Sequence, residues 1–152
     1  MTYATADARQ QMLDTLAAAT DELGLALAAL GEAYEHLDEN SGERLEQELF
    51  RPVQAAYGRA QRTHLEFAAR HGLPHHTFRP ASQRAPSAGV KGLLDGAATS
   101  VANADHTLAT LQDSMLPVEV GDPQLRAGLQ EVRALLADFA ARAHELVRTL
   151  GR

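Results

Sequence analysis

The chain has 152 residues, 45% of them hydrophobic, and a formal net charge of −6 at pH 7, which predicts a single globular domain over residues 1–152. Because it contains no cysteine, disulfides, thiolate-bound metals and cysteine nucleophiles are excluded, and its acidic charge disfavours nucleic-acid binding. No apolar run approaches the roughly 18 residues that span a bilayer, and the N-terminus lacks the pattern of a signal peptide, so we expect a cytoplasmic protein without a membrane partner.

The first predicted helix covers about residues 5–39. Its core-facing residues recur at alternating steps of three and four, as in a helix that packs in a bundle. They are Leu13, Leu16, Thr20, Leu23, Leu27, Leu30, Tyr34 and Leu37. The sequence Asn40-Ser41-Gly42 ends this pattern, and Asn40 with Glu43, or Ser41, reads as the cap of the next helix.

The second predicted helix covers about residues 42–71 and carries a similar stripe. Pro52 lies inside it and lacks a backbone donor, which predicts a kink rather than a break. Gly72 suits the left-handed conformation that ends many helices. The one long irregular segment then follows over residues 73–86, which contain three prolines.

The last two helices are predicted at about residues 87–115 and 123–150. Ser87 caps the first of them, and Pro117 ends it. Asp122 and Pro123 provide an N-cap and a first-turn proline for the second. Similar helix lengths and two short connections predict an all-α, antiparallel four-helix bundle. We expect up-down-up-down connections, with a long irregular loop between helices two and three.

Charge is distributed unevenly along the chain. Residues 1–58 carry eleven acidic and three basic residues, whereas residues 59–91 carry six basic residues and one acidic residue. Helix three begins in this basic stretch, and the free amides of a helix N-terminus suit an anion such as phosphate. The other interpretation is that these arginines are solvated and balance the acidic first helix. The predicted anion-binding residues are Arg79, Arg84, Ser87 and Lys91.

Histidines offer a second candidate site. His71, His75 and His76 lie within six residues at a helix end and in the following loop, and imidazoles so spaced can hold a transition metal. No carboxylate lies near them in the sequence, and a solvated histidine-rich turn is the alternative. The chain has neither the Glu-x-x-His motifs of di-iron bundles nor the His-Glu-x-x-His motif of zinc proteases, and no other cofactor motif is evident.

The outward face of the first helix suggests a partner. No charged residue occurs from Leu23 to Gly31, and Leu25 falls on the outward side. A helix that is apolar all round is usually buried all round, which predicts a homodimer through the Leu25 face. Since no nucleophile-plus-base signature is recognisable, the leading hypothesis is a non-enzymatic bundle protein that acts by binding. The alternative is a small-anion or metal-dependent activity at a basic bundle end formed by residues 71–91.

Overall fold

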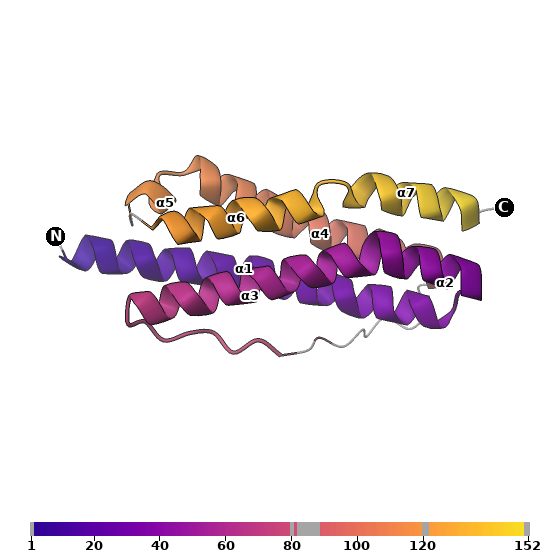
Figure 1. Cartoon of the computed structure of the whole chain (residues 1–152), viewed down its shortest axis with the longest axis horizontal. Coiled ribbons are helices and arrows are strands. Elements are labelled where there is room, and N and C mark those ends of the chain that lie inside the picture. The colour runs from indigo at the N-terminus through magenta and orange to yellow at the C-terminus, as the bar shows by residue number, and fades with distance from the viewer. Residues whose placement is uncertain (1, 80, 82–88, 120–121, 151–152) are drawn as a thin grey trace.

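The computed structural model describes residues 2–79, 81, 89–119 and 122–150. These residues form four rods that pack side by side (Figure 1), and the predicted all-α four-helix bundle is confirmed. The first and third rods are α1 and α4, the second joins α2, η1 and α3, and the fourth joins α6 and α7. The elements are α1 (Thr2–Glu35), α2 (Glu39–Leu45), the π-helical η1 (Glu46–Phe50), α3 (Arg51–Arg70), α4 (Gly89–Asp113), α5 (Leu116–Glu119), α6 (Pro123–Leu136) and α7 (Phe139–Leu150).

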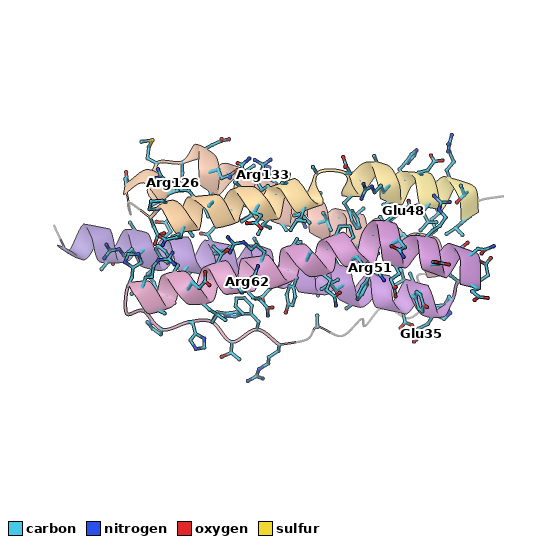
Figure 2. All side chains as sticks on the ribbon, viewed as in Figure 1. Glu35, Glu48, Arg51, Arg62, Arg126 and Arg133 are labelled. Carbon is cyan, nitrogen blue, oxygen red and sulfur yellow. The ribbon has the colours of Figure 1, made fainter. Side chains whose placement is uncertain are left out.

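The direction of the third rod corrects the up-down-up-down prediction. The fourth rod is antiparallel to α3. Arg70 at the end of α3 pairs with Asp122 at the start of α6, and Arg59, earlier in α3, pairs with Glu131, later in α6. The fourth rod is also antiparallel to α4, since the start of α4 lies beside α7 while Arg133 of α6, labelled in Figure 2, pairs with Asp105 later in α4. Therefore α3 and α4 run the same way, and the order is up-down-down-up (Figure 1).

The connection between α3 and α4 must consequently join opposite ends of the bundle. It spans residues 71–88, and eighteen extended residues reach about 60 Å. That reach exceeds the length of α4, which is about 38 Å at ~1.5 Å per residue. The connection is therefore long enough to join the two ends. Hydrophobic periodicity shows which face of a helix is buried, but it does not show in which direction the next helix runs.

The core contains most of the predicted stripe of α1. Leu13, Leu16, Leu23 and Leu30 are at most 1% exposed. Tyr34 is an exception, with 47% of its surface exposed. α1 ends one residue later, and the Tyr34 ring packs over Gly42 at the start of the next rod.

Pro52 is accommodated by a π-helical turn within a continuous rod. The N–H of Arg51 donates to the carbonyl of Glu46, five residues earlier, in η1. A wider turn of this kind removes the local need for the i−4 bond that Pro52 cannot make. The fourth predicted helix is interrupted instead, between Leu136 and Phe139. No helix in the described ranges combines the length and apolarity that crossing a membrane requires.

Candidate functional site

The connection begins with a segment that lies along the bundle, and we call residues 73–79 the strap. It has no regular secondary structure and runs beside α3 (Figure 1). Gly72 has a φ of 64°, as predicted for a left-handed helix end, and the N–H of Leu73 donates to the carbonyl of Ala68 at 2.9 Å. This C-terminal motif satisfies the last carbonyls of α3 and reverses the chain. Leu73 then packs against the core.

An open cavity of about 380 Å³ lies between the strap and α1, and we call it the strap groove. Its polar residues come from three elements that are distant in sequence. α1 provides Asp14 and Asp21, α3 provides His64, and the strap provides His75 and His76. The groove therefore combines carboxylates on one wall with imidazoles on the other.

His64 is the buried member of this group, with 1% of its surface exposed. Its Nε2 accepts the backbone N–H of His76 at 2.9 Å, so the ring proton of the neutral side chain lies on Nδ1. Nδ1 is buried, and the nearby Leu13 carbonyl lies outside hydrogen-bond geometry. Burial lowers the pKa of His64, and the nearby His76 and His75 lower it further, against the opposing effects of the Leu13 carbonyl and Asp14. His64 is consequently neutral at pH 7.

The exposed part of the groove contains the other histidines and the aspartates. His76 Nε2 lies 3.1 Å from Asp21 Oδ2, and Asp14 accepts a hydrogen bond from Gln10 at 2.9 Å. His75 Nδ1 lies 3.0 Å from the carbonyl of His76. Because a carbonyl only accepts, His75 carries a proton on Nδ1.

The structure separates His71 from the two other histidines of the predicted metal site. His71 donates through Nε2 to Asp122 at 3.0 Å, where Arg70 also donates to both carboxylate oxygens at 2.8 Å. His75 and His76 line the strap groove instead. Within the described ranges, no group of three or more histidine, aspartate or glutamate side chains is arranged to hold a metal ion.

The two described residues of the predicted anion site lie apart. Arg79 is exposed at the end of the strap, while Lys91 lies beside His144 of α7. The strap packs on His64, whose neighbour Thr63 contacts Gly128 of α6. The strap therefore lies at the level of Gly128. His144 lies about 24 Å further along the fourth rod, at ~1.5 Å per residue. The other two members, Arg84 and Ser87, lie outside the described residues. The described residues thus form no single basic end, because the strap runs along the bundle.

Two arginines of the basic stretch are neutralised by the fourth rod. Arg59 pairs with Glu131 at 2.9 Å, and Arg70 pairs with Asp122 at 2.8 Å. Both arginines belong to α3, and both carboxylates come from the sequence around α6, more than fifty residues away. These carboxylates belong to the fourth rod, not to the acidic first helix that the alternative interpretation named as the partner of the arginines.

Sequence reasoning missed Asp14, Asp21 and His64 as members of a common site. The two aspartates lie one heptad apart and so on the same side of α1, which is a weak signal shared by many solvated helices. No protein-family model matches the chain, and no curated protein or solved structure matches it significantly. Any function must therefore be inferred from the geometry of the groove.

Proposed function

We propose that this chain is a non-enzymatic binding protein and that the strap groove binds a small cationic ligand. The supporting observation is that Asp14 and Asp21 of α1 share an open groove of about 380 Å³ with three imidazoles. Carboxylates are ionised at neutral pH, and the low pKa of buried His64 keeps this side chain uncharged. The polar wall thus attracts a cation.

An organic diamine is the cation that we would test first. It carries two positive charges for the two carboxylates of α1 and needs no set of coordinating side chains. Zn²⁺ and Ni²⁺ serve as the comparison, because no three side chains in the described part of the chain are arranged to hold a metal ion.

Binding is a better account of the groove than covalent catalysis. Its described lining contains no serine, threonine, tyrosine, lysine or cysteine. A covalent mechanism based on these side chains needs one of them beside a general base. The pair of His76 with Asp21 holds a base in place but has no such nucleophile beside it.

Calorimetric titration tests the proposal with ZnCl₂, NiCl₂ and putrescine at pH 7.5. We expect the double variant Asp14→Asn/Asp21→Asn to bind the cation at least tenfold more weakly, which corresponds to about 1.4 kcal/mol. The control Asp7→Asn/Asp95→Asn removes the same charge from two exposed positions outside the groove and should bind like the wild type. Equal affinity in both double variants, or no binding of any of the three, would contradict the proposal.

A second proposed role is self-association through α1. Leu25 is 46% exposed, and its segment from Leu23 to Gly31 carries no charge. We expect the protein to sediment as a dimer at micromolar concentration. Leu25→Glu should shift it towards monomer, because unpaired charge in an apolar contact is costly. Leu65→Glu on α3, where Leu65 is 40% exposed, is the matched control, and a monomer at all concentrations of wild type would end the idea.

A further inference from the structure

The strap is fastened to α3 through a histidine that acts as an acceptor. The N–H of His76 donates to His64 Nε2 at 2.9 Å, and this bond joins positions twelve residues apart. An imidazole nitrogen accepts a hydrogen bond only when it carries no proton. Phe78 follows the same path and packs edge-on against the His64 ring, with centroids 5.1 Å apart. The described strap therefore sits on a side chain that must remain neutral.

We propose that the strap is a pH-sensitive wall of the strap groove, held against α3 by neutral His64 (the closed state) and released when His64 takes up a proton (the open state). Only the consequence for ligand binding rests on the proposed function, because release of the strap itself needs no ligand. The release occurs near neutral pH, because that is where histidine ordinarily changes its charge.

Protonation cannot be accommodated in the closed arrangement. It places a second donor on Nε2, opposite the N–H of His76, so two donors would face each other across 2.9 Å. The new charge would lie on a ring that is 1% exposed. A buried charge is unfavourable, and Asp14 and the Leu13 carbonyl offset this only in part, since the pKa of His64 is lowered overall. Movement of the strap removes the opposing donor and admits water to the ring.

Other titratable groups face this contact from both sides. His75 and His76 of the strap carry like charge whenever they are protonated, whereas Asp14 of α1 favours a charged His64. Asp21 of α1 attracts a protonated His76 and so holds the strap from the outer side. That pair is 42% and 50% exposed, and exposed ion pairs contribute little. The buried acceptor is therefore the stronger fastening.

The direction of the pH dependence follows from proton linkage. In the closed state, burial and the neighbouring histidines lower the pKa of His64 below its ordinary 6.5, while an exposed His64 in the open state keeps the ordinary value. The open state thus binds more protons. Opening should increase as the pH falls below about 6.5, by at most tenfold per pH unit, until the lowered pKa is reached.

Amide hydrogen exchange measured by NMR tests the release of the strap in the absence of ligand. Protection of the His76 amide, after correction for the intrinsic exchange rate, should fall about tenfold or more from pH 7.5 to pH 5. In His64→Gln the side-chain oxygen can accept the same N–H but does not titrate, so protection should persist at both pH values. In His64→Leu the acceptor is lost, and protection should be low throughout.

Constant protection in the wild type, or an equal decline in His64→Gln, would overturn the proposal. If the variants fail to fold, the ¹⁵N shifts of the wild-type His64 ring decide the question. Nε2 should be unprotonated at pH 7.5, and its protonation should coincide with the loss of His76 protection. A ring that titrates without that loss would also overturn it. Failure of cation binding in the strap groove would leave these results unchanged, so the two proposals can fail separately.

Discussion

Replacing Asp122 by alanine should lower the free energy of unfolding by about 3–5 kcal/mol, the usual cost of breaking a buried ion pair. The Asp122 side chain is 3% exposed and accepts from Arg70 at 2.8 Å and from His71 at 3.0 Å. It also accepts the N–H of Leu125 at 2.9 Å as the N-cap of α6. The substitution would leave two partly buried donors without a partner and uncap the helix. Urea unfolding measures the loss.

The stability of the protein at acidic pH distinguishes the contribution of the Asp122 charge from that of its helix cap. Burial alone would raise the pKa of this carboxyl, but hydrogen bonds from the Leu125 amide, Arg70 and His71 hold that pKa below its ordinary 3.8. The stabilisation is therefore present above about pH 4 and is lost as the pH falls through the lowered pKa. Asp122→Asn keeps a capping oxygen but loses the charge. Its free energy of unfolding should therefore be lower than that of the wild type at neutral pH, and this difference should become smaller below about pH 4. A difference in the free energy of unfolding that is the same at pH 3 as at pH 7 would contradict a stabilising role of the Asp122 charge.

Gly128→Ala is expected to destabilise the protein by about 3 kcal/mol, at the upper end of the usual cost of overpacking. Gly128 of α6 lies against the Thr63 side chain of α3. A Cβ at this position would overlap Thr63 Oγ1 and lie 2.7 Å from Thr63 Cγ2. Thr63 is held in place because its hydroxyl donates to the Arg59 carbonyl at 2.8 Å. One of the two rods must therefore move, and chemical denaturation should report the cost.

A double-mutant cycle tests whether Thr63 is the cause. Thr63→Ala removes both γ atoms, so the added methyl of Gly128→Ala should cost much less in the Thr63→Ala background, giving a coupling energy of about 1–3 kcal/mol. Gly96→Ala is the control, because a Cβ there meets nothing within 4 Å. It should stabilise α4 by up to about 1 kcal/mol through helix propensity. Equal costs of Gly128→Ala in both backgrounds would exclude this contact.

Much of the bundle could be predicted because apolar spacing reports directly which helix face is buried. Leu13, Leu16 and Leu23 occupy the core as their spacing predicted. Spacing does not report direction, and the order of the rods depends on whether residues 71–88 turn at one end or cross to the other. Both paths satisfy the length of the connection, so the sequence pattern alone could not distinguish them.

The site was harder to predict because its residues meet only along the crossing path. Proximity in sequence groups His71, His75 and His76 as one candidate site. In the structure, His76 instead contacts Asp21 and His64, which come from other rods. The end of α3 turns His71 towards Asp122. Local spacing therefore predicts that the strap carries imidazoles, but it does not predict which side chains of the other rods they contact.

The most direct test of the strap groove is an NMR titration of ¹⁵N-labelled wild-type protein with putrescine at pH 7.5. Binding in the groove predicts that the largest shifts occur at Asp14, Asp21, His75 and His76, which line the cavity. Signals of Lys91 and His144, which lie together at another level of the bundle, should remain unchanged. Absence of shifts in the groove, or shifts centred on His144, would contradict the assignment of this groove as the binding site.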